Sequence, residues 1–428
     1  MFIDLLSSAG SEIVETGTQN PGWRWFTSPM EELQRVLPRA PGVGEVFQLL
    51  RTGPMTRAQL CAVTGQARST IAARLDSLLD VGLIGQRGER PVAMGRPASS
   101  FYFRPEAGAV LAIDIGASHL RVGVTDLATS ILAEEHLDLS VDRGPTVVLE
   151  EVIRLGRTLL AGIDLDTSRL AGVGIGVPGP VSHTSGKPSS PPIMPGWDGW
   201  DIMGSLRDAF DVPVYVDNDA NMMAIGEHAL AWKDTQDLLF VKFATGVGLG
   251  IILDGQIRRG AQGSSGDIGH VRVPGGPPNL CHCGGTGCLE AVVGVQNLAA
   301  QLREAGLDAQ TGTDIVGLVR SGEKAAVQVV REAGRTAGEV LAGVVSLLNP
   351  SVIAVGGILG QAHEQLIAGI RETVYAKSLP LATQDLRIVA SVAGPRAGII
   401  GASALVCDQV LSASAVEALV DGRNALAV

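Results

Sequence analysis

Apolar residues recur at spacings of three and four in three short runs near the start of the chain, a pattern that predicts three helices. The apolar positions are Val46, Leu49 and Leu50 in the first run, Leu60 and Val63 in the second, and Ile71, Leu75, Leu78 and Leu79 in the third. Thr56 fits the N-cap of the second helix and Gly65 its end, and the third helix starts at Arg68. An apolar strand at Leu83–Ile84 and a loop rich in Gly, Arg and Pro complete the layout of a winged helix-turn-helix, which we assign to residues 41–103.

The residues before this domain show no sustained hydrophobic period. Prolines in NPGW and LPRAPG interrupt residues 1–40, so we expect a poorly ordered arm there, with at most one short helix at Met30–Val36. The first pattern able to form a core is therefore that of the winged helix.

From Ala109 onward, short apolar runs alternate with helical stretches. Two runs are expected to form hairpins, AVLAIDIGASHLRVGVTDL and LLFVKFATGVGLGIILDG, and two are single strands that enter glycine loops, LAGVGIGVPGPV and SVIAVGGIL. The stretch PVYVDNDANMMAIGEHAL fits a strand followed by an amphipathic helix. Repeated units of strand, turn and helix predict an α/β domain, assigned to residues 104–428, with ligands near the carboxyl ends of the strands.

Length and composition fit this division. The 428 residues, of which 46% are hydrophobic and 18% charged, suffice for two or three domains with sizeable cores. The N-terminus lacks a basic segment followed by an apolar core, and no stretch reaches about 18 uninterrupted apolar residues. We therefore expect a cytoplasmic protein without a membrane partner.

The distribution of charge singles out the winged helix. The chain carries a formal net charge of −11, yet residues 41–100 contain seven arginines against four acids, a local charge of +3. The remaining 26 basic and 40 acidic residues give −14. A basic segment in an acidic chain is typical of a DNA-binding domain.

In a helix-turn-helix the second helix of the pair lies in the major groove, so residues near its N-terminus face bases and phosphates. Those residues here are Gln66, Arg68, Ser69, Thr70 and, one turn further on, Arg74. Arg96, between a glycine and a proline in the wing, is placed to enter a narrow minor groove. We predict double-stranded operator DNA as a partner; the alternative is a small protein-interaction domain whose arginines are only solvated.

Three glycine-containing turns are candidates for phosphate binding. They consist of Asp114 and Gly116, of Thr245 and Gly246 in ATGVGLG, and of Gly356 and Gly357 after SVIAV. A carboxylate after a strand can hold a hydrated Mg²⁺, and glycine lets backbone N–H groups approach a phosphate. Each turn can equally be a plain hairpin or a bend that needs a positive φ.

The motif DNDAN lies where a strand meets a helix. Asp219 there can accept a proton from a substrate hydroxyl, while Asn218 and Asn221 hold neighbouring hydroxyls or fix the loop. Helix capping is the alternative, because Asp and Asn favour N-caps. These residues alone do not decide between the two interpretations.

Three of the five cysteines, in NLCHCGGTGCLEA, indicate a metal site. With the nearest upstream histidine, the candidate ligands are His270, Cys281, Cys283 and Cys288. A His/Cys₃ set fills all four positions of a tetrahedral structural zinc site. His282 competes as a ligand, but the cysteines on both sides would strain it. Redox chemistry is the alternative, although Cys-x-Cys is not the usual Cys-x-x-Cys pair.

Five stretches, in order and spacing, resemble the ROK family (repressors, open reading frames, kinases), specifically its transcription-factor branch. They are GIGVPGPVSHTSG, PGW, VDNDAN, TGVGLGIILDGQIRRGAQGSSGDIGH and CHCGGTGCLEA, and the resemblance covers residues 41–411. It implies an actin-like, ribonuclease-H-like ATPase fold behind a winged helix. Its two lobes would enclose a cleft that binds a sugar or a sugar derivative.

The resemblance also implies roles for single residues. Asn218 and Asp219 match the sugar-binding pair, Asp219 being the base in kinase members. His270 matches the histidine that ligates zinc and contacts the sugar, and the three cysteines match the other zinc ligands. Asp267 stands where the family usually has a sugar-binding glutamate, so the reach of the carboxylate differs.

A second departure concerns ATP. Kinase members carry Asp-Ile-Gly-Gly-Thr-Lys at the first phosphate turn, whereas this chain has DIGASH, from Asp114 to His119. The lysine that meets ATP is missing, which weakens the expected site for ATP and Mg²⁺.

Together these features predict a sugar-responsive transcriptional regulator of carbohydrate genes, expected to be a repressor. A symmetric homodimer or homotetramer would read a pseudo-palindromic operator. The alternative is an ATP- and Mg²⁺-dependent sugar kinase with Asp219 as its base, and the missing Thr-Lys disfavours it.

Overall fold

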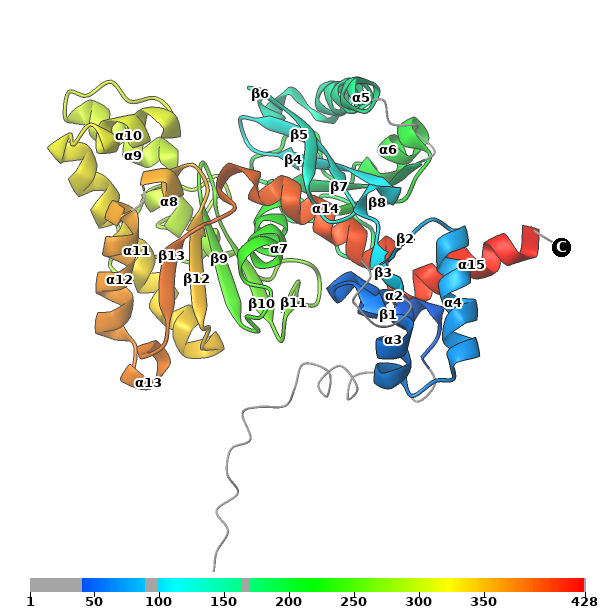
Figure 1. Cartoon of the computed structure of the whole chain (residues 1–428). Helices are drawn as coiled ribbons and strands as arrows, with labels where there is room; N and C mark the ends of the chain where they lie inside the picture. Colours follow the sequence, from blue (N-terminus) through cyan, green and yellow to red (C-terminus); the bar gives the residue numbers. More distant parts are fainter. Residues whose placement is uncertain (1–40, 89–98, 164–168, 363, 427–428) are drawn as a thin grey trace, which may run out of the picture.

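The structure is a computed structural model that describes residues 41–88, 99–163, 169–362 and 364–426. The predicted arm at residues 1–40, including Met30–Val36, and the wing residue Arg96 lie outside the described residues. Figure 1 shows a small domain, in blue, beside two larger lobes.

The small domain is the predicted winged helix. Its helices are α2 (Val43–Thr52), α3 (Arg57–Thr64) and α4 (Arg68–Asp80), and its strands are β1 (Met55–Thr56), β2 (Ile84–Gly88) and β3 (Ser99–Phe103). The strands form an antiparallel sheet in the order β1-β3-β2. The Thr56 hydroxyl accepts a hydrogen bond from the backbone of Gln59, and Gly65 ends α3 at φ 68°, so both predicted helix boundaries are confirmed.

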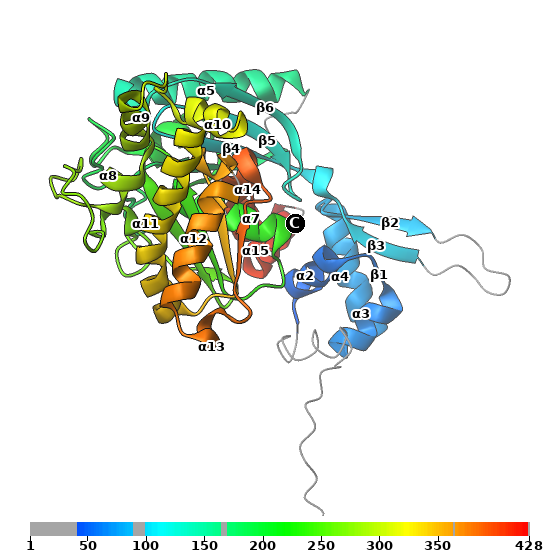
Figure 2. The same ribbon diagram turned by 90° about the vertical axis from the view of Figure 1, so that its left-hand side faces the viewer.

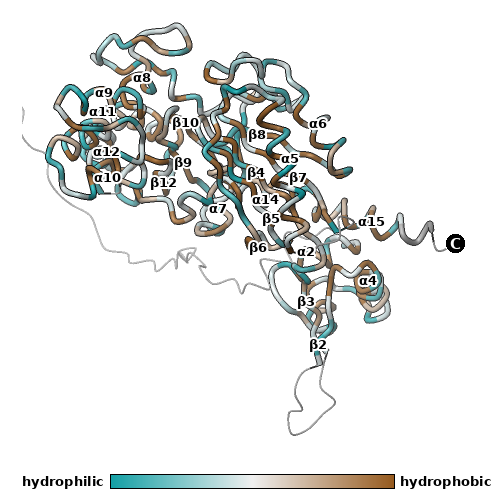
Figure 3. Tube along the Cα trace, turned by 90° about the horizontal axis from the view of Figure 1, so that it is seen from above, coloured by the Kyte–Doolittle hydropathy of each residue, from teal (hydrophilic) through white to brown (hydrophobic). Residues whose placement is uncertain are grey.

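The first lobe is built on a five-stranded sheet in the order β6-β5-β4-β7-β8. The strands are β4 (Ala109–Ile115), β5 (Leu120–Asp126), β6 (Ile131–Leu137), β7 (Leu170–Val177) and β8 (Val214–Asn218), and the helices are α5 (Pro145–Gly162) and α6 (Ile202–Phe210). Every residue of β4 is buried, and brown, hydrophobic segments mark β4 and β7 in Figure 3. Such continuous apolar runs are expected of strands that are covered on both faces.

The second lobe repeats this topology, with the strand order β11-β10-β9-β12-β13. The strands are β9 (Leu238–Phe243), β10 (Val247–Leu253), β11 (Gln256–Ile257), β12 (Val352–Gly356) and β13 (Arg387–Ala390). The helices are α8 (Leu289–Val293), α9 (Val295–Glu304), α10 (Gly312–Arg320), α11 (Lys324–Leu348), α12 (Glu364–Lys377) and α13 (Pro380–Thr383). In each sheet, successive antiparallel pairing adds two strands on one side of the first strand, and parallel pairing adds two on the other side. This is the arrangement of the predicted two-lobed actin-like fold.

Two helices, α7 (Asp219–Ala231) and α14 (Ala397–Val410), lie between the lobes in Figure 1. The two helices pack so closely that a side chain at Gly226 or Gly401 would collide with the backbone of the opposite helix. The expectation of an amphipathic helix after DNDAN was wrong. Most of α7 is buried, since it is covered by α14 on one side and by β9 and β10 on another.

The chain crosses between the lobes twice, through α7 and through the segment that precedes α14, and Glu227 ties the two crossings together. Its carboxylate is fully buried and accepts hydrogen bonds from the Ser391 hydroxyl at 2.6 Å and from the backbone N–H groups of Val392 and Ala393 at 2.9 and 3.0 Å. Such dense hydrogen bonding is what a buried carboxylate requires.

The last helix, α15 (Ala413–Leu426), packs on α2 of the winged helix, and Figure 2 shows α2 next to α15 at the edge of the lobes. Val406, Leu411 and Val416 belong to the same hydrophobic cluster as the core of the winged helix. Within the described chain no single helix is long and apolar enough to cross a membrane; one bent pair, Gly394–Val410 with Ala413–Gly422, passes on length and composition alone.

Candidate ligand cleft and metal-binding cluster

A cavity of about 570 Å³ lies between the lobes, within the size range of small-molecule sites. Residues of the first lobe and of α7 line it on one side, among them Asp114 and Asp219. Lys242, Thr245 and His270 line it from the second lobe. The cleft therefore collects residues from segments that are distant in sequence.

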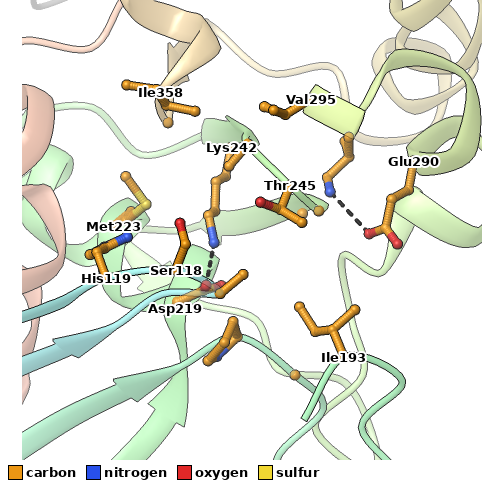
Figure 4. A pocket seen from close by; sticks show the side chains of 18 of the residues that line it. Ser118, His119, Ile193, Asp219, Met223, Lys242, Thr245, Glu290, Val295 and Ile358 are labelled. Atoms are coloured by element: carbon orange, nitrogen blue, oxygen red, sulfur yellow. Dashed lines mark hydrogen bonds and ion pairs between the residues drawn. The ribbon is translucent and has the colours of Figure 1, made fainter. Parts of the chain in front are cut away.

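Asp219 forms an ion pair with Lys242 at the centre of this cavity, as the dashed line in Figure 4 marks. Asp219 is the first residue of α7 and is 4% exposed. Burial raises the pKa of this carboxyl, and the positive charge of Lys242 opposes the rise. Sequence reasoning missed Lys242, although a single lysine within the buried run LLFVKF signals a charge that needs a partner.

Asn218 caps α7. Its side-chain oxygen accepts hydrogen bonds from the backbone of Ala220 and Asn221 at 2.9 and 3.4 Å, and its amide donates to the Gly179 carbonyl at 3.1 Å. The capping interpretation of Asn218 is therefore confirmed. Asn218 also lines the cavity, so the same residue can do both.

Asn221 and Asp217 lie behind the cavity wall. The Asn221 amide donates to Asp217 at 2.8 Å, and Arg259 donates its Nε–H to the other oxygen of Asp217 at 2.6 Å. This buried network holds the start of α7 against the loop that follows β11. Sequence reasoning missed the Arg259 contact, because nothing in the local pattern links two positions 42 residues apart.

The first phosphate turn is occupied by a histidine. The Nε2 atom of His119 lies 3.6 Å from a carboxylate oxygen of Asp114. Burial alone would raise the pKa of Asp114, but His119 and the charges of Lys242 and Arg121 outweigh it, so the pKa is lowered. Gly116 does not line the cavity, and its N–H donates to the His119 carbonyl at 2.9 Å, closing the hairpin.

The other two predicted phosphate turns reach the same cavity in part. Thr245, Gly246 and Gly357 line it, whereas Gly356 lies in strand β12, outside the lining. The structure therefore brings four of the six candidate residues, Asp114 among them, to one cleft.

The four predicted metal ligands also come together. Their donor atoms, from His270, Cys281, Cys283 and Cys288, lie within 4.8 Å of one another. The distance from His270 Nδ1 to Cys281 Sγ is 3.5 Å, and that between the sulfurs of Cys283 and Cys288 is 3.8 Å. A tetrahedral zinc with ordinary bond lengths has N···S and S···S separations of about 3.6 and about 3.8 Å. The donor set and its spacing therefore fit a metal ion of this kind.

His282 is outside this cluster. Its Nε2 atom lies 3.2 Å from the side-chain oxygen of Gln296. The histidine that joins the cysteines is therefore His270, as the sequence predicted.

The cluster adjoins the cleft through His270. While Nδ1 faces the sulfurs, Nε2 lies 3.9 Å from Asp267, and both residues line the cavity. Glu290 lines it too, accepts a hydrogen bond from the Val247 N–H at 3.3 Å, and has its pKa raised by burial. Sequence reasoning missed Glu290, although it lies two residues after the last cysteine of the cluster.

On the winged helix, the start of α4 is open to solvent. Arg68, Ser69 and Thr70 are exposed in its first turn. Arg74, by contrast, donates to the side-chain oxygen of Gln66, whose amide donates to the Pro41 carbonyl at 2.9 Å. Of the residues predicted to contact DNA, Arg68, Ser69 and Thr70 are therefore exposed to solvent, whereas Gln66 and Arg74 are hydrogen-bonded to each other.

Comparisons with known proteins cover both parts of the chain. The family model described as ROK family matches residues 110–409. The xylose repressor of Bacillus subtilis is 25% identical over 367 residues, 85% of this chain and 94% of the relative. The N-acetylglucosamine repressor of Escherichia coli O157:H7 is 26% identical over 388 residues, 88% of this chain and 94% of the relative.

Two solved structures extend these matches. A ROK family transcriptional regulator, described as a homologue of the E. coli MLC protein, superposes with a TM-score of 0.74 at 27% identity and covers 89% of this chain and 98% of its own. A ROK family glucokinase from Streptomyces griseus, in complex with glucose and AMPPNP, gives a TM-score of 0.61 at 28% identity and covers 70% and 99%.

Proposed function

The chain belongs to the ROK family, and from that premise we propose that it is a sugar-responsive, DNA-binding transcriptional regulator that acts as a repressor. The extent of the similarities carries this proposal. The glucokinase is covered almost completely, yet it matches only 70% of this chain, whereas the ROK regulator and the curated repressors match 84% or more. The regulators match a part of this chain that the glucokinase does not match, and that part is about as long as the winged helix.

We propose that the cleft binds a sugar or a sugar derivative. Asp219, Asp267 and Glu290 offer carboxylates, and His270 offers a ring nitrogen, around one cavity. Such groups accept and donate hydrogen bonds to several hydroxyls at once, and a site built to bond hydroxyls strongly rejects ligands that lack them. Asp267, which is half exposed at the cavity edge, is the residue best placed to tune which sugar is bound.

The contacts around the phosphate turns support a receptor over a kinase. Asp219 is paired with the ammonium of Lys242, and Asp114 lies 3.6 Å from the ring nitrogen of His119, so both carboxylates already have a partner within the chain. Phosphoryl transfer needs a free base and charge neutralisation at the phosphates. We therefore infer that catalysis is lost while the sugar site is kept.

We propose that the His/Cys₃ cluster holds Zn²⁺ in a structural role. A bound zinc with four protein ligands fixes their positions without offering a site for water. Here it would fix the ring of His270, whose other nitrogen faces Asp267 and the cleft. The cluster would thereby set the geometry of the sensing pocket.

For DNA, we propose that the first turn of α4, with Arg68, Ser69 and Thr70, enters the major groove. Arg96 is proposed to contact the minor groove from the wing. A homodimer or homotetramer would present two such helices to a pseudo-palindromic operator.

We infer that α14 links the sugar cleft to the winged helix. Gly394 and Pro395, just before α14, line the cavity, and Asp408, near its other end, lies 3.8 Å from Arg51 of α2. Gln48 of α2 donates a hydrogen bond to the Leu411 carbonyl at 2.6 Å. A sugar changes DNA affinity only if it binds two arrangements of these parts unequally.

The direct test measures fluorescence anisotropy of labelled DNA from upstream of the protein's own gene, with and without a panel of pentoses, hexoses and amino sugars. We expect salt-sensitive binding that one sugar class reverses, and thermal stabilisation by the same sugar. A coupled ADP-release assay is run in parallel. Robust phosphorylation that Asp219→Asn abolishes, with no DNA binding at any salt concentration, would overturn the proposal in favour of the kinase.

A further inference from the structure

Two buried carboxylates from different elements converge in the cleft. Asp114, near the end of β4, is 6% exposed, and Asp219, the first residue of α7, is 4% exposed. Asp114 pairs with Gly176 across β4 and β7, and a Cβ atom at Gly176 would lie 3.5 Å from the Cα of Asp219, so the two acidic residues are neighbours. In keeping with this, the charge of Asp114 raises the pKa of Asp219. Two buried carboxylates side by side are costly unless a cation neutralises them, and in proteins that cation is often a divalent metal.

Lys242 supplies a cation from the opposite lobe. Its ammonium pairs with Asp219, its charge also lowers the pKa of Asp114, and its side chain is only 12% exposed. In Figure 4 the lysine extends from β9 and its nitrogen points at Asp219. One ammonium thus acts on both carboxylates.

We propose that Lys242 is a tethered cation that occupies a latent divalent-metal position between Asp114 and Asp219. An ammonium carries one charge and three donors, but unlike Mg²⁺ or Mn²⁺ it has no coordination sites that could hold phosphate oxygens. This inference rests on the proposed function and deepens it. With Lys242 in the position of the metal, the cleft would bind a sugar but no metal–nucleotide complex.

The proposal predicts what happens when the tethered charge is removed. Lys242→Ala removes the ammonium and opens space beside the two carboxylates, with His119 still nearby. Mn²⁺ should then bind at least about tenfold more tightly than to the wild type, because one unit charge at this range changes a cation's affinity by more than that. Electron paramagnetic resonance of free Mn²⁺ measures the binding directly.

Two matched variants locate the effect. Lys242→Ala combined with Asp219→Asn should lose the gain, because one of the two carboxylates is neutralised. Lys233→Ala, which removes an exposed lysine just after α7, should bind Mn²⁺ like the wild type. The His270 and cysteine cluster is common to all variants, so any Mn²⁺ it takes up cancels in the comparison.

Lys242→Gln keeps a polar side chain of similar length and serves if the alanine variant does not fold. Mn²⁺ should raise its melting temperature more than that of the wild type. Equal Mn²⁺ binding by wild type and both Lys242 variants would overturn the proposal, as would a gain that survives Asp219→Asn. The assay contains neither sugar nor DNA, so its failure would leave the repressor proposal to its own test.

Discussion

At the scale of single residues, His270 connects two features that the sequence places apart. One ring nitrogen lies among the sulfurs of the metal cluster and the other faces Asp267 at the edge of the cleft. A change at the cluster should therefore alter the orientation of the His270 ring in the cleft, because a metal and the groups around it fix the orientation of a histidine ligand.

Cys283→Ser tests this connection. Since a neutral serine hydroxyl is a poor replacement for a thiolate, we expect the purified variant to lose bound zinc and, with it, the sugar-dependent release of operator DNA. Metal content by mass spectrometry and DNA anisotropy are the two measurements. Cys61→Ser, in α3 and outside the cluster, is the control. Full zinc content in the Cys283 variant would contradict the assignment.

At the scale of elements, the contact between α7 and α14 determines how the two lobes meet. The helices approach through Gly226 and Gly401, where a methyl group would collide with the facing backbone. α14 also ends beside Arg51 and Gln48 of the winged helix, so we expect a shift at this contact to reach that domain.

Gly401→Ala should therefore destabilise the protein by roughly 1–3 kcal/mol, the usual result of overpacking a close contact. Urea unfolding monitored by circular dichroism measures the change. Gly343→Ala in α11 is the matched control, since a methyl group there meets nothing within 4 Å. The control should be neutral or up to about 1 kcal/mol more stable, because alanine is the better helix former. Equal stabilities for both variants would exclude a close contact at Gly401.

At the scale of the whole molecule, charge is divided between the parts. The winged-helix segment is basic whereas the rest of the chain is acidic, so we expect the acidic lobes to repel DNA and the exposed start of α4 to attract it. We therefore predict that DNA binds at the surface that carries Arg68.

Arg68→Ala is expected to weaken operator binding and to lower the slope of log affinity against log salt by about one, the effect of losing one phosphate contact. Arg154→Ala, on α5 of the first lobe, removes a surface arginine that pairs with Glu151 and should change neither quantity. An unchanged slope for the Arg68 variant would place the DNA contact on another surface.

From the sequence alone one could predict the helices of the winged domain, the strands β4, β5, β7, β8, β9, β10 and β12 of the lobes, and the four side chains that come together in the His/Cys₃ cluster. These features are local: apolar periodicity defines each element, Thr56 and Gly65 bound α3, and three cysteines within eight residues limit the ways of surrounding an ion. The structure differed where an element's surroundings mattered, as for α7, which was expected to show one face to solvent and is instead enclosed.

Which charges meet depends on how the elements pack in three dimensions. Lys242 and Asp219 are 23 residues apart, Arg259 and Asp217 are 42 apart, and Gln48 and Leu411 are 363 apart. A hydrophobic pattern records that a position is buried but not which element covers it. The partner of a buried charge follows from strand order and from the packing of one lobe on the other, and it was these that paired Lys242 with Asp219 in the cleft.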